Sequence, residues 1–331
     1  MFDSLTSLLK EYPTIDLLLP AFAACMLFAG LHCYMGLHII RRGVIFVDLA
    51  LAQMAALGTT VALVISPYFL GPEIHHHAGT AEAASVQSEA GARDLEAKEA
   101  LTTMGEEKDP RQEVFSYVLS LSFTFLGAAL FSIFRFRDNR VPHEALIGIS
   151  YVVAAALAML VLSKSPHGAE EVEQMMVGNL LLVNWADVGK TAILYTCLAI
   201  PHLIWGRRFL KISTNVGEAE AGGMNVRLWD FFFYAIFGFM VTESVRIGGV
   251  LVIFSFLIIP AVCAAIFFRS FWRCLLFGWG IALVASLSGL WFSYHADMPT
   301  GESLVAAFGA ALVICAVINQ FFGGRGVVKG S

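Results

Sequence analysis

Charged residues are scarce in this sequence of 331 amino acids: they make up 14% of it, whereas hydrophobic residues make up 58%. A water-soluble domain has about 25% charged and roughly 45–50% apolar residues, so this composition excludes a soluble globular protein. The 26 acidic and 21 basic side chains give a net charge of −5, which also excludes nucleic acid as a partner. The composition indicates a chain that lies in a lipid bilayer.

The common signatures of catalysis are also absent from the sequence. It has no G-x-x-x-x-G-K-[ST] phosphate-binding loop, no H-E-x-x-H motif and no G-x-S-x-G motif. Its six cysteines lie in apolar runs without a C-x-x-C spacing, so we expect them to pack as small core residues. We therefore predict that the chain is not an enzyme, and that an ion gradient or another subunit supplies the energy for any uphill transport.

Nine hydrophobic stretches are long enough, or nearly so, to cross a hydrocarbon core of ~30 Å as helices that rise ~1.5 Å per residue. They are residues 17–40, 44–70, 114–134, 144–163, 187–206, 228–245, 248–268, 274–294 and 302–322. The sixth and seventh are barely separated, so one of them is a candidate for a broken or re-entrant element. We predict an all-α fold: a polytopic helical membrane protein with about eight or nine transmembrane helices, forming one domain over residues 1–331.

Basic residues gather in alternate connections between these stretches. They are Arg41, Arg42, Arg135, Arg137, Arg140, Arg207, Arg208, Lys211, Arg227, Arg269, Arg273, Arg325 and Lys329. Because cytoplasmic loops carry an excess of Lys and Arg, we assign these connections to the cytoplasm. The N-terminus is then expected outside the cell and the C-terminus in the cytoplasm.

One connection, residues 71–113, is long and polar, with ten acidic residues against four basic ones. By alternation it lies outside the cell, and its composition cannot bury enough apolar surface to fold alone. Imidazole and carboxylate groups together suit Zn²⁺, Mn²⁺ or Fe²⁺, so we predict outer residues that collect metal. The predicted set is His75, His76, His77, His167, His295 and Asp297. An ordinary solvated loop is the alternative interpretation.

Polar residues at membrane depth are costly and therefore candidates for function. Asp48, in the second stretch, offers a hard oxygen ligand for a cation, and Gln53 follows about 140° further around a helix. His32 lies in the first stretch and Glu243 in the sixth. We predict that these four residues line a metal transport path. The alternative is that they fix helix packing by hydrogen bonds, with Glu243 paired to Arg246 three residues later.

Residues 213–225 are rich in small residues and lie between basic flanks on the predicted cytoplasmic side. The segment is too polar to span a membrane, and Gly222 and Gly223 are suited to end a helix. We predict a short surface helix that docks in a groove of a soluble partner, with an ordinary loop as the alternative.

Five segments, in this order, resemble the membrane (permease) subunit of metal-ion ABC transporters of the zinc/manganese/iron uptake family. They are Arg41–Gln53 (RRGVIFVDLALAQ), Glu144–Ile149 (EALIGI), Val177–Asp187 (VGNLLLVNWAD), Gly248–Ala261 (GGVLVIFSFLIIPA) and Tyr294–Gly301 (YHADMPTG). The resemblance runs from about Leu31 to Ile318. One departure concerns the G-D-A-x-S-H motif of most of the family: here Asp48 is shifted by one position, and Ala52-Gln53 replaces Ser-His.

The resemblance implies a permease that imports a divalent metal ion (Zn, Mn or Fe) by alternating access in the plasma (inner) membrane of a prokaryote. It implies no permanently bound cofactor, and ATP used only through a partner chain. The implied partners are cytoplasmic ATP-binding subunits, an extracytoplasmic metal-binding protein and a second permease copy, as in a homodimer. The residues that match the family's A-x-A-x-G coupling element, with the acid before it, are Glu218, Ala219, Glu220, Ala221, Gly222 and Gly223.

Two other functions remain open at the level of sequence. One is a secondary metal cation transporter that is driven by an ion gradient and works without a partner. The other is a permease for a metal chelate of the siderophore or cobalamin type.

Overall fold

A computed structural model describes residues 13–70, 110–134, 142–163, 178 and 180–322. Its elements are α2 (Pro13–Arg42), α3 (Val47–Leu70), α5 (Pro110–Ile133), α6 (His143–Leu162), the 3₁₀ turn η2 (Leu180–Leu182), α8 (Trp185–Thr214), α9 (Val216–Ala221), α10 (Val226–Phe267), α11 (Phe271–Ala296) and α12 (Thr300–Phe322). Within these ranges, eight helices are long and apolar enough to cross a membrane. The prediction of an all-α, polytopic membrane protein is confirmed.

The longest helix, α10, is broken near its middle. Its 42 residues would extend about 63 Å as a straight helix, twice the hydrocarbon thickness of a bilayer. At Gly249, φ is 74° and ψ is 161°, a conformation that glycine alone adopts without strain. Gly178, which also has a positive φ, packs so closely that a Cβ there would lie 2.3 Å from the Gly249 nitrogen.

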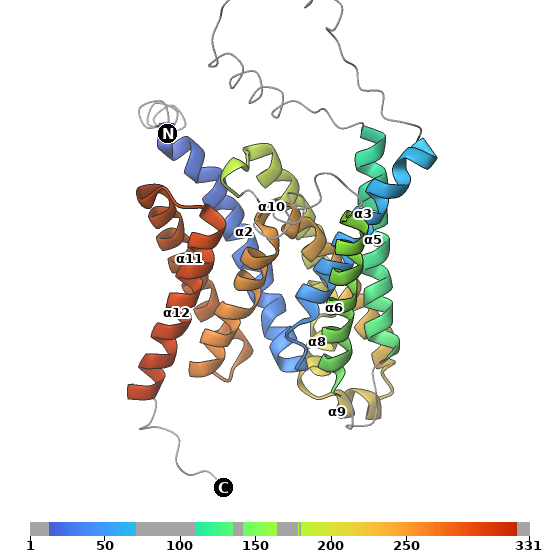
Figure 1. Ribbon diagram of the computed structural model, residues 1–331. Coiled ribbons are helices and arrows are strands. Elements are labelled where there is room, and N and C mark those ends of the chain that lie inside the picture. Colours follow the sequence, from blue (N-terminus) through green and yellow to red (C-terminus); the bar gives the residue numbers. More distant parts are fainter. Residues whose placement is uncertain (1–12, 71–109, 135–141, 164–177, 179, 323–331) are drawn as a thin grey trace, which may run out of the picture.

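The break folds α10 back on itself, so that both of its ends lie beside the last turn of α2. Near its start, Asp230 pairs with Arg42, and just after its end the Arg269 carbonyl accepts a hydrogen bond from Arg41. Figure 1 shows α10 rising from the end of the bundle that holds α9 and then returning toward that end. The sixth and seventh predicted stretches are therefore the two halves of one broken helix, and each half crosses the bundle.

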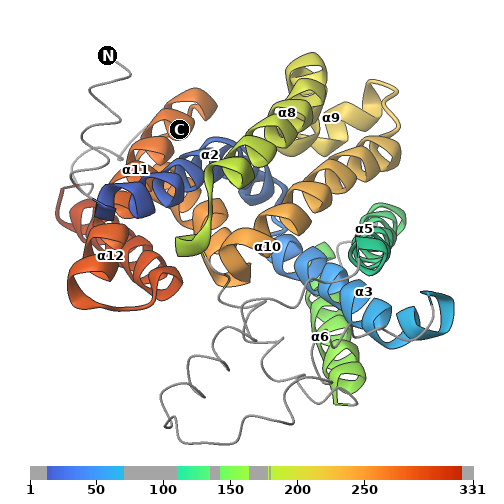
Figure 2. The same ribbon diagram turned by 90° about the horizontal axis from the view of Figure 1, so that it is seen from above.

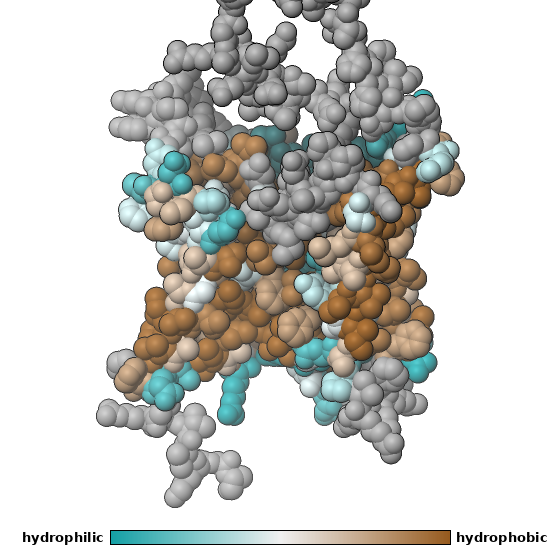
Figure 3. Space-filling model, viewed as in Figure 1, coloured by the Kyte–Doolittle hydropathy of each residue, from teal (hydrophilic) through white to brown (hydrophobic). Residues whose placement is uncertain are grey.

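The bundle has two distinct ends. In Figure 1, α9 and the last turn of α12 lie at one end, which we call the inner end, and the first turn of α2 lies at the other, the outer end. Between these ends, Figure 3 shows a band of hydrophobic side chains, with hydrophilic side chains above and below it. This distribution matches a bilayer with water on both sides.

Seen from above, α2 and α10 lie between the α11–α12 pair and the group formed by α3, α5 and α6 (Figure 2). The helix α10 contacts α2, α3, α5, α11 and α12. It approaches α2 so closely that a Cβ on Gly36 would lie 1.9 Å from the carbonyl oxygen of Leu257. Small residues at such crossings let membrane helices pack backbone to backbone.

This crossing generates a stability prediction. Gly36→Ala should lower the free energy of unfolding by roughly 1–3 kcal/mol, because the added methyl group meets a backbone carbonyl that cannot move alone. Gly30→Ala is the control in the same helix: a Cβ there would meet no atom within 4 Å, so the change should be neutral or mildly stabilising. Thermal unfolding of the purified full chain in detergent measures both, and equal Tm values for the two variants would contradict the packing.

Candidate functional site

Three buried polar residues on three helices contact one another inside the bundle, and a fourth, on α3, lies within electrostatic range of them. His32 of α2, Asp48 of α3, Tyr195 of α8 and Ser244 of α10 are each between 0% and 5% exposed. The Tyr195 hydroxyl hydrogen-bonds the Ser244 hydroxyl and lies 3.5 Å from Nδ1 of His32. Asp48 lies within electrostatic range of the same Tyr195 hydroxyl. We call these four residues the central polar cluster.

Two atoms of this cluster can accept a hydrogen bond, but no donor among the described residues bonds either of them. Nδ1 of His32 bonds the Phe28 carbonyl over 3.1 Å, and this bond places the ring proton on Nδ1 and leaves the lone pair on Nε2. Nε2 of His32 and Oδ1 of Asp48 are both buried, and neither meets a hydrogen-bond partner among the described residues. Buried acceptors without donors are costly, and a cation bound by either atom would reduce that cost.

The central polar cluster is not a closed metal site. Among the described residues, no group of three or more His, Cys, Asp and Glu side chains stands ready to hold a metal ion. The cluster therefore offers at most an imidazole and a carboxylate, with Tyr195 and Ser244 contributing oxygen atoms nearby. A metal ion held by two protein ligands, with water as its other ligands, is bound weakly. Weak binding suits a site in a transport path, because the site must release the ion again.

The other two path residues predicted from the sequence lie apart from the cluster centre. Gln53 is half-buried, and because α3 is a regular helix here it lies about 140° around the axis from Asp48. Glu243 is half-buried next to Ser244, within electrostatic range of Tyr195 and of Tyr117 of α5. The structure thus places both Asp48 and Glu243 within electrostatic range of Tyr195, the residue that lies beside His32. It leaves Gln53 on another face of α3.

The ion pair expected between Glu243 and Arg246 is not among those that the described residues form. Arg246 instead lies 3.5 Å from Glu113, in the first turn of α5, and both side chains are exposed. Arg246 lies three residues before the break at Gly249 and beside the first turn of α5, where Glu113 is within its reach. That expectation was wrong because spacing along one helix does not show which neighbouring helix a side chain can reach.

The predicted outer, metal-collecting residues are only partly placed. His295 is exposed, stacks on Trp291 at 4.4 Å between ring centroids and hydrogen-bonds the Trp291 carbonyl. Asp297 is exposed and ends α11 with a left-handed φ of 50°. His75, His76, His77 and His167 lie outside the described residues, as does most of the loop 71–113, whose last four residues form the first turn of α5.

The predicted coupling segment 213–225 contains a six-residue helix, α9, at the inner end. Asn215 caps it by accepting a hydrogen bond from the Glu218 backbone, and Ala219 is completely buried against Ile212 and Val226. The other residues predicted to couple are exposed: Glu218, Glu220, Ala221, Gly222 and Gly223. The buried alanine fixes α9 to the bundle, and the exposed residues form a surface that another chain can contact.

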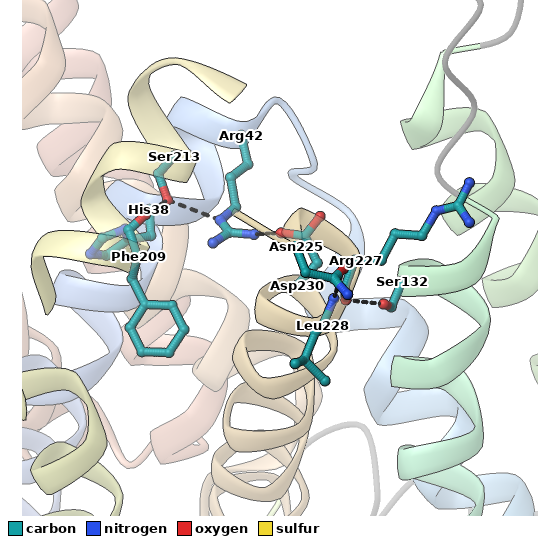
Figure 4. Close-up of polar contacts among 9 residues, drawn as sticks. All are labelled: His38, Arg42, Ser132, Phe209, Ser213, Asn225, Arg227, Leu228 and Asp230. Atoms are coloured by element: carbon teal, nitrogen blue, oxygen red, sulfur yellow. Dashed lines mark hydrogen bonds and ion pairs between the residues drawn. The ribbon is translucent and has the colours of Figure 1, made fainter. Parts of the chain in front are cut away.

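A second polar group, which the sequence analysis did not identify, lies just above α9. Arg42 lies between Ser213 of α8 and Asp230 of α10, and its side chain and that of Asp230 are each only 1% exposed (Figure 4). Arg42 was expected in a cytoplasmic connection because it is basic and adjoins a hydrophobic stretch. The signal that could have located its partner is Asp230, an acidic residue near the start of the sixth hydrophobic stretch.

Comparison with known proteins agrees with this architecture. The model of the ABC 3 transport family matches residues 113–319. The manganese transport system membrane protein MntC of Listeria innocua serovar 6a is 25% identical over 197 residues, which cover 57% of this chain and 70% of MntC. The manganese import system permease protein ScaB of Streptococcus parasanguinis is 23% identical over 203 residues, which cover 57% and 70%.

Solved structures show the same fold. PsaBC from Streptococcus pneumoniae, in complex with Fab, aligns with a TM-score of 0.65 at 16% identity, covering 94% of this chain and 95% of the other. A putative metal-chelate type ABC transporter in an inward-facing conformation aligns with a TM-score of 0.58 at 18% identity, covering 93% and 89%. The resemblance to metal-ion ABC permeases is confirmed, and because the family model spans more than half of the sequence, the chain belongs to the ABC 3 transport family.

Proposed function

We propose that this chain is the membrane subunit through which an ABC transporter imports a divalent metal ion, with Mn²⁺ or Fe²⁺ as cargo. The observation that carries the proposal is the central polar cluster: in an ABC 3 permease, an imidazole nitrogen and a carboxylate oxygen on two helices are buried without a donor among the described residues. Relatives named as manganese transport proteins support the choice of metal.

Asp48 and His32 are the protein ligands that the passing ion meets in this proposal. A carboxylate oxygen and a neutral imidazole nitrogen are a ligand pair that Mn²⁺ and Fe²⁺ accept. His32 of α2 supplies the imidazole. It takes the place of the histidine that most of the family carries four residues after the aspartate and that this chain lacks. Glu243, at the edge of the cluster, attracts the cation from the outer side, since the first half of α10 runs from there to the outer end.

The packing around the cluster favours a bare or partly hydrated ion over a bulky chelate. The Phe28 ring lies 5.8 Å from the His32 ring and 6.3 Å from the Tyr195 ring, centroid to centroid. The Phe256 ring also packs on Phe28, 5.9 Å away between centroids. These aromatic rings pack closely beside the polar residues, whereas a siderophore or a corrin would need a wide cavity.

The partners follow from the position of α9. We place the inner end in the cytoplasm, where the exposed residues of α9 dock on ATP-binding subunits that power transport. The first turn of α2 then faces the outside of the cell. A metal-binding protein delivers the ion to the permease at that end, and a second copy of the permease completes the transporter. A secondary transporter would need none of these chains, so dependence on an ATPase separates the two functions.

Asp48→Asn tests the ion path. The amide preserves the shape of the side chain but removes the charge that a divalent cation requires, so uptake of radioactive Mn²⁺ should fall at least about tenfold, which corresponds to about 1.4 kcal/mol. The measurement is uptake by metal-transport-deficient cells that express the full chain with its own ATPase. Asp187→Asn, which changes a partly exposed aspartate at the start of α8, is the matched control.

Both variants must be compared at equal amounts of protein in the membrane. Uptake by Asp48→Asn at the level of Asp187→Asn would remove the central polar cluster from the transport path. Uptake that continues after ATP depletion would instead favour the secondary transporter.

Ala221→Arg tests the docking of α9. The substitution adds a bulky charge to an exposed position, so the chain should keep its Tm, while co-purification with the ATP-binding subunit should fall at least about tenfold. Ser163→Arg, an equally exposed change at the far end of α6, is the control and should keep the complex intact. An unchanged complex with Ala221→Arg would show that the ATPase docks elsewhere.

A further inference from the structure

We propose that the buried Arg42–Asp230 ion pair is the joint through which movement of α9 reaches the ion ligand Asp48. The inference rests on the proposed function, because it requires an ATPase that moves α9. It assigns a positioning role in transport to a pair of residues that do not touch the ion.

The contacts of Arg42 connect three helices at one point. Its Nη1 lies 2.6 Å from Oδ1 of Asp230 on α10, and its Nε donates to the Ser213 hydroxyl of α8 over 2.9 Å. The flat face of the guanidinium lies 3.8 Å from the ring centroid of Phe233. Ser213 also bonds Nδ1 of His38, one turn earlier on α2, so α2 and α8 are joined twice (Figure 4).

These contacts hold both ends of α9. Ser213 lies two residues before Asn215, the residue that caps the start of α9. On the other side, Asn225 caps the start of α10 by accepting the Leu228 backbone hydrogen bond, and Asp230 follows one turn later. A displacement of α9 therefore moves the Ser213 and Asp230 side chains, and both are attached to the same guanidinium.

The other side of the joint leads to the ion site. Arg42 is the last residue of α2, and the turn after it is held by backbone hydrogen bonds from Gly43 to Ile40 and from Val44 to Ile39. The backbone of Ile45 donates to Glu144 of α6, which fixes the turn from outside. Asp48 lies in the first turn of α3, six residues after Arg42, so a shift of the last turn of α2 is passed to Asp48 through this short connection.

The burial of both charged side chains gives this joint two stable arrangements. Both side chains are buried, so separating the two charges without giving either of them access to water is costly. The pair is therefore stable when it is formed, or when one partner has moved far enough to reach water or a new partner. A small movement of α9 is thereby converted into two discrete arrangements rather than a continuous drift.

The experiment uses the full chain with its own ATP-binding subunit in lipid vesicles, in which radioactive Mn²⁺ uptake and ATP hydrolysis are measured together. The variants are Arg42→Gln, Asp230→Asn, the exchanged pair Arg42→Asp/Asp230→Arg, and Ser213→Ala. The control is Arg41→Gln, since the neighbouring Arg41 contacts the Arg269 carbonyl and the Phe271 ring at the inner surface instead of Asp230.

We expect Arg42→Gln and Asp230→Asn to lower the number of ions imported per ATP at least about tenfold while ATP hydrolysis stays within about twofold of the wild type. The exchanged pair should recover at least about a third of the wild-type ratio, because the charges still meet, and the control should stay within about twofold. Ser213→Ala leaves the ion pair in place and should fold normally, so a lowered ratio in this variant supports the joint even if the charge variants fail to accumulate.

An unchanged ratio of ions to ATP in folded Arg42→Gln, Asp230→Asn and Ser213→Ala would overturn the inference and leave the proposed function standing. An exchanged pair that folds but transports no better than the single variants would also overturn it. Wild-type vesicles that hydrolyse ATP without importing Mn²⁺ would overturn the proposed function itself, and this inference with it.

Discussion

Burying a polar or charged group away from water costs several kcal/mol unless a partner compensates it, and this constraint organises the interior of the bundle. Arg42 and Asp230 satisfy most of it by pairing with each other, supported by Ser213 and the Phe233 ring, although Nη2 of Arg42 is buried without a hydrogen-bond partner among the described residues. Asp48 and His32 satisfy it only in part, since each has one buried acceptor atom without a partner among the described residues. The paired charges are suited to hold helices together, and the unpaired acceptors are suited to receive a cation.

The same constraint explains why the two polar groups lie at different depths on shared helices. α2 contributes His32 to the central polar cluster and Arg42 to the ion pair, and α8 contributes Tyr195 and Ser213 in the same order. α10 contributes Ser244 and Asp230. Three helices thus carry a residue of each group, and close packing such as that at Gly36 gives them little freedom to move independently. In the mechanism that we propose, these rigid elements transmit to the cluster a movement that is imposed at the inner end.

Much of the fold could be predicted from the sequence, because hydrophobic length is a strong signal in lipid. The helix ends fall within a few residues of the predicted stretches for most spans, although α8 extends to Thr214. A broken or re-entrant element was expected at the sixth or seventh stretch, but the sharp reversal at Gly249 could not be predicted, because composition does not reveal the backbone conformation of a Gly-Gly pair. The family was recognised from five short segments, one of which contains Asp48.

The candidate site was predictable only in outline. Asp48 and His32 stand out as polar residues in apolar runs, but Tyr195 does not, because tyrosine is common in membrane helices. The pairing of Arg42 with Asp230 joins residues far apart in the sequence, and no local spacing reveals such a contact. Charge sign alone placed Arg42 at the membrane surface, whereas the tertiary structure provides a buried partner for it.

The account depends most on the claim that the central polar cluster binds the transported ion, and direct metal binding tests that claim without any partner. The purified full chain should bind about one Mn²⁺ per chain, as measured by equilibrium dialysis or by the loss of the free-ion electron paramagnetic resonance signal. His32→Ala should weaken that binding at least about tenfold, because it removes the only imidazole of the cluster. Mn²⁺ binding that is unchanged in His32→Ala, or absent from the wild type, would contradict the account.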